Sequence, residues 1–281
     1  MKKYILLIVL ILSMSLVYGS SRFSITMGET TYNNPKYKEI IMDYFQSKTD
    51  KNIENASIDV IRASEVNRIS EEVTGSVYDS DQIFSCAMVD LDHDNLTVIV
   101  DQSKIRLATS QMYSNALKSA GIEKGYVVVS SPFTSSGEAA LTGIFKSYET
   151  IVGAQIPDEV KKAALKEMYL QTRLADETGE SGDTIAQLIS QVKNKTESEN
   201  INDTQRIKNV VIEVSNNLNI DLTSTQIADI SEVIANSQKA RGLSAGFREK
   251  LEKLSGGAEP ENQLYSWLQS RYNYLISLLS T

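Results

Sequence analysis

Cysteine and histidine are almost absent, since the 281 residues contain one of each, Cys86 and His93. A single cysteine excludes an intramolecular disulfide framework, and the two residues together cannot form a Cys/His zinc site within one chain. Most Ser–His and Cys–His catalytic arrangements are excluded as well, unless His93 is the base. Cys86 lies in the apolar segment Ile83–Val89, which predicts a buried, unreactive thiol.

Long hydrophobic runs are missing too, except at the N-terminus. Lys2 and Lys3 precede the apolar run Tyr4–Leu12, and small residues follow it. This pattern is typical of a secretory signal peptide over residues 1–19, with cleavage after Gly19. The alternative is an uncleaved N-terminal membrane anchor, although the serines that follow the run make this segment a poor membrane-spanning helix. We therefore expect a secreted or cell-surface protein that contacts a membrane only through an uncleaved N-terminus.

Proline and glycine are few, at 4 and 14 residues, whereas 41% of the residues are apolar and 23% are charged. This is an ordinary globular composition, which argues against disorder and collagen. Acidic residues outnumber basic ones, and the formal net charge is −8. An acidic chain repels the phosphates of nucleic acids. We therefore expect a cell-envelope component or another exported protein as the partner, and no nucleic acid.

Residues 20–153 alternate between strand-like and helix-like segments, which predicts an α/β domain. In chain order we expect a strand at 57–61, a helix at 64–72, strands at 83–89 and 96–100, a helix at 110–120 and a strand at 126–130. The two central strands flank a polar turn, a pattern typical of a hairpin. The order βαββαβ predicts a ferredoxin-like sandwich, a fold that many unrelated functions share.

Residues 154–281 have helical periodicity almost throughout, which predicts a C-terminal helical bundle built on apolar stripes. Pro157 and Gly179 mark the two ends of its first helix. A last helix containing Trp267 is expected to join the bundle, because its polar face is not rich in Lys and Arg. The polar stretch 193–204 is predicted to be a flexible connector. The expected fold class is thus α+β.

The polar turn resembles a calcium-binding loop. Asp90, Asp92, Asp94 and Asp101 occupy positions 1, 3, 5 and 12 of such a loop, where a hard cation takes oxygen ligands. However, position 12 is normally Glu, and helices rather than strands flank an EF-hand loop. A solvated hairpin turn accounts for the same residues and is the favoured interpretation. Calcium is the one cofactor that the sequence suggests, at this turn.

Two further short patterns resemble known functional motifs. The capping box Ser135–Glu138 opens a helix directly after a strand, a context in which phosphates bind. Its glycine spacing does not fit a P-loop, so we interpret it as an ordinary capped helix in which Gly143 allows close packing. Ser190 and Lys193 match the unspecific pattern S-x-x-K without its companion motifs, and we assign them no role.

Residues 109–149 resemble the exported prokaryotic family catalogued as domain of unknown function 1002. The resemblance rests on Thr109–Ile122, Val127–Pro132 and Gly137–Glu149, and it extends less sharply over residues 24–260. It implies export and a shared fold, and it brings no established activity. A site common to the family would lie in the stretch Ser130–Glu149. The candidate residues of that site are Ser131, Gly137, Thr142, Lys146 and Glu149.

A binding or structural module at the cell envelope is the expected function, rather than an enzyme, because an exported chain with few catalytic side chains is poorly equipped for catalysis. The first alternative is a hydrolase that acts on cell-envelope polymers through paired carboxylates, which need no histidine. Its acidic residues would come from Asp79, Asp81, Asp90, Asp92 and Asp94. The second alternative is a calcium-dependent adhesion module that uses the acidic turn.

Overall fold

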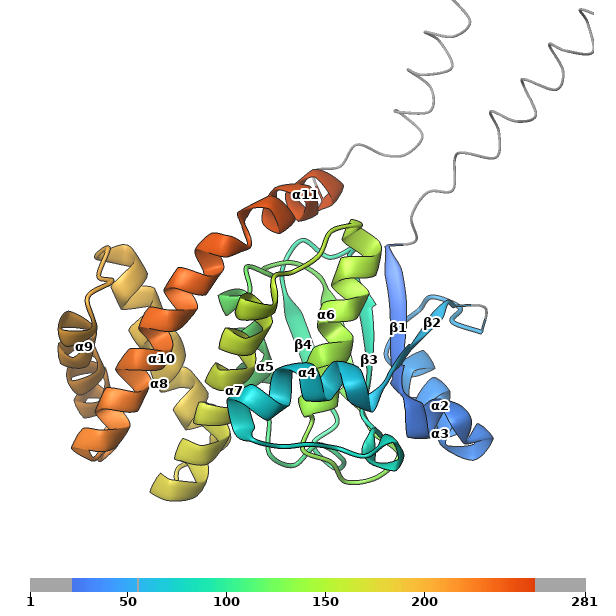
Figure 1. The fold of residues 1–281 in the computed structure, drawn as a ribbon, viewed down its shortest axis with the longest axis horizontal. Coiled ribbons are helices and arrows are strands. Elements are labelled where there is room, and N and C mark those ends of the chain that lie inside the picture. Colours follow the sequence, from blue (N-terminus) through green and yellow to red (C-terminus); the bar gives the residue numbers. More distant parts are fainter. Residues whose placement is uncertain (1–21, 55, 256–281) are drawn as a thin grey trace, which may run out of the picture.

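The computed structural model describes residues 22–54 and 56–255. The expected signal peptide and the expected last helix lie outside the described residues. Figure 1 shows a sheet with helices on both faces and a further group of helices beside it. Within the described ranges, no helix combines the length and apolar character needed to cross a membrane.

The sheet has five strands in the order β2-β1-β3-β5-β4. These strands are β1 (Phe23–Gly28), β2 (Ile58–Ile61), β3 (Cys86–Asp90), β4 (Thr97–Val100) and β5 (Tyr126–Ser130). β3 is antiparallel to both of its neighbours, β1 and β5, whereas β2 and β4 pair in parallel at the two edges. The carboxyl ends of β1, β2, β4 and β5 therefore meet at one edge of the sheet, beside the start of β3.

The ferredoxin-like arrangement is not confirmed. The predicted hairpin of β3 and β4 is wrong, because β5 lies between these strands and pairs with both. The turn before β4 is bound to the loop before β5 instead: Leu96 N–H donates to Glu123 O at 2.9 Å, and Gly125 N–H donates to His93 O at 3.0 Å. These backbone bonds direct β4 away from β3. In addition, β1 occupies the position between β2 and β3, and the sequence pattern did not reveal this strand.

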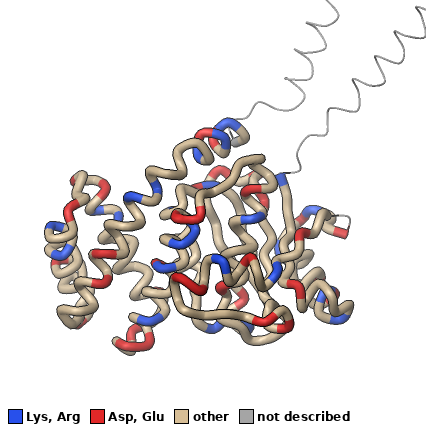
Figure 2. The backbone as a smooth tube through the Cα atoms, in the orientation of Figure 1, with Lys and Arg blue, Asp and Glu red and all other residues tan. Residues whose placement is uncertain are grey.

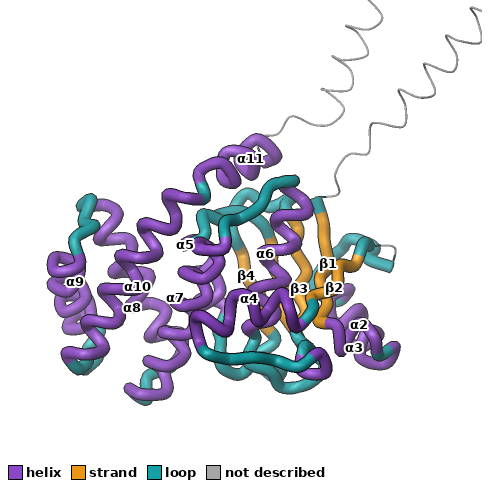
Figure 3. The backbone as a smooth tube through the Cα atoms, viewed as in Figure 1, coloured by secondary structure: helices purple, strands orange, loops and turns teal. Residues whose placement is uncertain are grey.

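Helices cover both faces of the sheet (Figure 3). One face packs against α3 (Pro35–Gln46), which follows the short α2 (Glu29–Asn33). The other face packs against helices whose bounds are α4 (Ala63–Thr74), α5 (Ser110–Ser119) and α6 (Glu138–Val152). β3 shows the alternation that this layering needs, because Cys86 and Met88 belong to the core under α3, whereas Ala87 and Val89 belong to the opposite core.

Gly143 lets α6 lie directly on the sheet. A Cβ atom at this position would lie 2.6 Å from Oγ1 of Thr26 on β1. That distance is shorter than any ordinary carbon–oxygen contact, so a larger residue would push the helix outward. The interpretation of Gly143 as a close-packing residue is therefore confirmed.

A run of helices completes the described chain. Their bounds are α7 (Asp158–Thr178), α8 (Gly182–Ser198), α9 (Thr204–Asn217), α10 (Ser224–Leu243) and α11 (Ala245–Ser255), and a short 3-10 helix, η1 (Ser80–Gln82), precedes β3. The predicted flexible connector at 193–204 is wrong over its first half, since α8 continues to Ser198. Thr196 is buried, and Lys195 lies 2.5 Å from Glu213 of α9, so these polar residues belong to a packed helix.

The core does not stop at residue 153. Val160, Ala164 and Leu165 of α7 belong to the same apolar cluster as the residues under α5 and α6. A second cluster lies among α7, α8, α9 and α10. α7 thus contributes to both clusters. Its residue Glu167 also forms an ion pair with Lys193, which lines the polar site described next.

Candidate functional site

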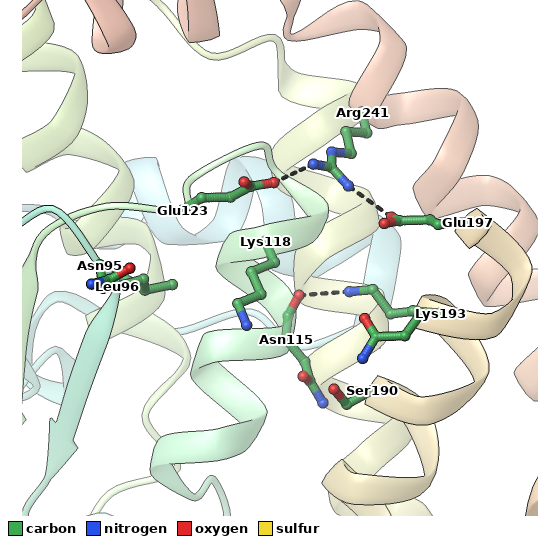
Figure 4. A pocket seen from close by; sticks show the side chains of 10 residues that line it. Asn95, Leu96, Asn115, Lys118, Glu123, Ser190, Lys193, Glu197 and Arg241 are labelled. Atoms are coloured by element: carbon green, nitrogen blue, oxygen red, sulfur yellow. Dashed lines mark hydrogen bonds and ion pairs between the residues drawn. The ribbon is translucent and has the colours of Figure 1, made fainter. Parts of the chain in front are cut away.

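A polar cleft lies where α5, α8 and α10 meet, beside the turn before β4 (Figure 4). Its volume is about 370 Å³, within the size range of small-molecule sites, which is roughly 300–1,000 Å³. We call it the first cleft. Its lining residues are polar or charged with one exception, and they are Asn95, Leu96, Asn115, Lys118, Glu123, Ser190, Lys193, Asn194, Glu197 and Arg241.

The floor of the first cleft is a buried ionic network. Nζ of Lys193 on α8 lies 2.9 Å from Oε1 of Glu167 on α7, a residue with no exposed surface. The same ammonium donates to Ser119 Oγ at 2.6 Å and to the backbone oxygen of Asn115 at 2.8 Å. The second oxygen of Glu167 accepts hydrogen bonds from Ser119 at 2.5 Å and from Ser237 at 3.0 Å. Because every polar atom has a partner, the network holds α5, α7, α8 and α10 in one arrangement.

Asn115 fixes the same junction from the side of α5. It is 2% exposed, and its amide donates to Oε1 of Gln171 at 2.9 Å and to the backbone oxygen of Ala186 at 2.8 Å. A buried amide with all these partners is costly to displace. The first cleft therefore has a rigid base.

Arg241 forms one wall of the first cleft. Its guanidinium donates to Glu197 of α8 at 2.7 Å and also to Glu123 in the loop before β5 (Figure 4). By contrast, the ammonium of Lys118 and the hydroxyl of Ser190 have no hydrogen-bond partner in the described part of the chain. The cleft thus combines charges that are already paired with donors that remain available to a ligand.

The S-x-x-K pair, to which sequence analysis assigned no role, does reach the first cleft. Ser190 and Lys193 both line it. However, Lys193 donates three hydrogen bonds, to Glu167, Ser119 and Asn115, so its nitrogen has no free lone pair. It is therefore not placed to act as a base for Ser190.

The structure does not bring the four carboxylates of the predicted calcium loop together. Nζ of Lys51 lies 2.7 Å from the buried carboxylate of Asp90 and 2.6 Å from that of Asp92, and its hydrogen bond lowers the pKa of Asp92. Asp94 is exposed beside them. Asp101 lies at the far end of β4, where it accepts a hydrogen bond from Ser130 at 2.9 Å. Within residues 22–54 and 56–255, no three His, Cys, Asp or Glu residues are grouped as metal ligands.

The carboxylates considered for a hydrolase are also dispersed. Asp79 caps η1 and Asp81 lies within it. Asp90 and Asp92 share one ammonium, that of Lys51, rather than facing each other across an open groove. The carboxylates that do line the first cleft, Glu123 and Glu197, are residues that sequence patterns did not suggest.

The residues of the suggested family site extend from the end of β5 to the last turns of α6. Ser131 is buried after β5, and Gly137 begins the helix, where its carbonyl accepts a hydrogen bond from Tyr113 Oη at 2.7 Å. Thr142 is partly exposed. Lys146 lies 2.7 Å from Glu65, and Glu149 forms an ion pair with Lys161 of α7. At 1.5 Å per residue, Gly137 and Glu149 are about 18 Å apart along the helix axis, so the structure does not bring these two residues together.

Cys86 is buried, as predicted, and burial raises the pKa of its thiol to about 12. His93 is largely exposed, and its Nε2 lies 3.8 Å from Asp90.

One pattern in the sequence points to the first cleft. Asn115 and Ser119 lie four residues apart on the buried face of α5. Glu167 and Gln171 have the same spacing on the buried face of α7. Polar residues at this spacing on apolar faces predict a buried network between two helices. Arg241 and Glu123 gave no such signal, because 118 positions separate them.

A family model described as "Protein of unknown function (DUF1002)" matches residues 27–254. The chain is also similar to the uncharacterized protein YpuA of Bacillus subtilis (strain 168), with 34% identity over 128 residues. This alignment covers 45% of the chain and 43% of the relative, so it spans less than half of either protein. No solved structure matches.

Proposed function

The chain belongs to the family of proteins of unknown function DUF1002, and from its geometry we propose that it is a non-catalytic binding module at the cell envelope. The observation that carries the proposal is the first cleft, where a rigid ionic floor supports donors that lack protein partners. Lys118 and Ser190 supply an ammonium and a hydroxyl, and Asn194 is exposed beside them. The N-terminal signal pattern supports a location outside the cytoplasm.

The chemistry of the first cleft favours binding over hydrolysis. General acid–base catalysis by carboxylates needs one group that holds its proton near neutral pH. Both carboxylates of the cleft instead form ion pairs with the guanidinium of Arg241, so neither is an unpaired group that faces a ligand. The ligand class that suits the cleft is a small polar molecule with hydroxyl, amide or carboxylate groups, such as a soluble fragment of an envelope polymer.

Thermal unfolding of the exported protein with soluble glycan and peptidoglycan fragments tests this proposal. A ligand that binds the folded state must raise the unfolding midpoint. The rise should be lost in Lys118→Ala and kept in Lys36→Ala, which removes an exposed lysine on α3 at the opposite face of the sheet. A response that both variants keep would show that the ligand binds elsewhere. Recovery of the mature protein from the cytosol would contradict the location.

A further inference from the structure

A second groove begins on the other side of the Arg241–Glu197 pair. Its volume is about 580 Å³, and it lies between the end of α8, the last turns of α10 and α11. It shares Glu197 and Arg241 with the first cleft. Its other lining residues are Thr196, Asn200, Ile201, Asn202, Ala235, Gln238, Lys239, Gly242 and Arg248.

The second groove is positively charged in an acidic protein. Its cations are Lys239, Arg241 and Arg248, against the single carboxylate of Glu197. Since Arg241 already binds Glu197, two cations remain, and neither has an ion-pair partner in the described part of the chain. Figure 2 shows basic positions near the end of α10 and on α11. In a chain with a net charge of −8, uncompensated cations that line one groove indicate an anionic ligand.

Two side chains that line the second groove also carry buried polar atoms without hydrogen-bond partners in the described part of the chain. Nε2 of Gln238 donates to the backbone oxygen of Ile201 at 3.1 Å and to Thr196 Oγ1 at 3.1 Å. The backbone oxygen can only accept, so it fixes the orientation of the amide and leaves Gln238 Oε1 as a buried acceptor without a donor. Nε of Arg248 is likewise a buried donor without an acceptor. Atoms in this state cost free energy until a partner satisfies them.

We propose that the second groove binds a phosphorylated polyol or sugar. A phosphate offers several oxygens, so it can accept from the fork of Arg248 and from the ammonium of Lys239 at once. A hydroxyl group on the same molecule donates to Oε1 of Gln238. A neutral sugar would leave the two cations unpaired, and an inorganic anion without hydroxyl groups would leave Gln238 without a donor.

This inference deepens the proposed function, on which it rests for the class of ligand. The first cleft and the second groove meet at Arg241 and Glu197, so one extended envelope polymer can contact both. Its phosphate would lie in the second groove and its neutral part in the first cleft.

Calorimetric titration of the exported protein with sn-glycerol 3-phosphate tests the inference, with glycerol and glucuronate as comparisons. We expect the phosphate to bind more tightly than either, with an affinity that falls as salt is added. Arg248→Met and Lys239→Gln should each weaken binding by about tenfold, since each removes a hydrogen bond between charged groups. Arg248→Met keeps the aliphatic stem, which packs against Gly121. Lys36→Gln on α3 is the matched control for lost charge.

The possible outcomes separate this inference from the proposed function. If glycerol 3-phosphate binds no better than glycerol while neutral glycan fragments still act through Lys118, the second groove is not an anion site and the first cleft stands. If the phosphate binds through Arg248 while neutral fragments have no effect, the inference stands and the role of the first cleft falls. Glucuronate binding as tightly as the phosphate would overturn the assignment of phosphate.

Discussion

Nζ of Lys161 lies 2.6 Å from Oε1 of Glu149 where α7 packs on α6, and both side chains are buried. The same carboxylate oxygen accepts the backbone N–H of Ile156 at 2.8 Å. The pair therefore joins the sheet-covering helices to the helices that follow.

We predict that Glu149→Ala destabilises the protein by about 3 kcal/mol, because it leaves the buried ammonium of Lys161 with Asp158, 3.9 Å away, as its remaining counter-charge. Urea unfolding measures the difference. Glu249→Ala is the control, since Glu249 pairs with Lys253 on the exposed surface of α11, where ion pairs contribute little. Equal losses for the two variants would contradict the structural role of Glu149.

Gly143→Ala is expected to cost about 1–3 kcal/mol, because its Cβ atom would force α6 away from Thr26 on β1. Adding Thr26→Ala should recover part of the loss, since it removes the nearest atom. Gly242→Ala in α10, where a Cβ atom meets nothing within 4 Å, should be neutral or stabilising. The denaturant midpoints of the variants measure these changes in stability. If Gly143→Ala leaves the stability unchanged, α6 is not in direct contact with β1.

Glu138 should make stability depend on pH. Burial raises the pKa of Glu138, and a hydrogen bond from Tyr78 Oη at 2.6 Å offsets this only in part. The folded state then holds the proton more tightly than the unfolded chain does, so stability is lost as pH rises from the unfolded pKa through the folded one. Glu138→Gln should therefore gain stability at pH 7 and none at pH 4. Urea unfolding at the two pH values tests this prediction. A gain in stability at pH 4 alone would show that folding lowers the pKa of Glu138 rather than raising it.

Calcium is not expected to raise the unfolding midpoint. Asp101 is separated from Asp90 by the length of β4, and Lys51 already occupies the space between Asp90 and Asp92. Lys51→Met should instead destabilise the protein by about 1–3 kcal/mol, because buried Asp90 loses its charged donor. Thermal scans with calcium and with chelator provide the measurement. A midpoint that rises with calcium and no longer rises in Asp92→Ala would restore the adhesion hypothesis.

Helix positions followed from local patterns. The helix expected at 110–120 is α5 (Ser110–Ser119). A helix does begin at Glu138, but the capping box predicted at Ser135–Glu138 is wrong, because Gly137 is the N-cap residue of α6 and no side chain caps this end. Such patterns depend on residues within one or two turns of each other, so they can be interpreted without knowing the fold. Strand pairing was different, because the polar turn after β3 is equally compatible with a hairpin and with the crossover that the structure contains.

The amino-acid sequence alone was enough to indicate the α+β class, most of the helices and a buried Cys86, since composition and local periodicity carry that information. The family was indicated separately, by the resemblance of residues 109–149. Only the tertiary structure decided the strand order, the separation of Asp101 from Asp90, and the meeting of Arg241 with Glu123 and Glu197. Those relationships depend on which distant segments pack together. The packing of distant segments depends on the total apolar surface that many side chains bury, and on networks such as the one around Glu167. A short sequence pattern contains neither of these contributions.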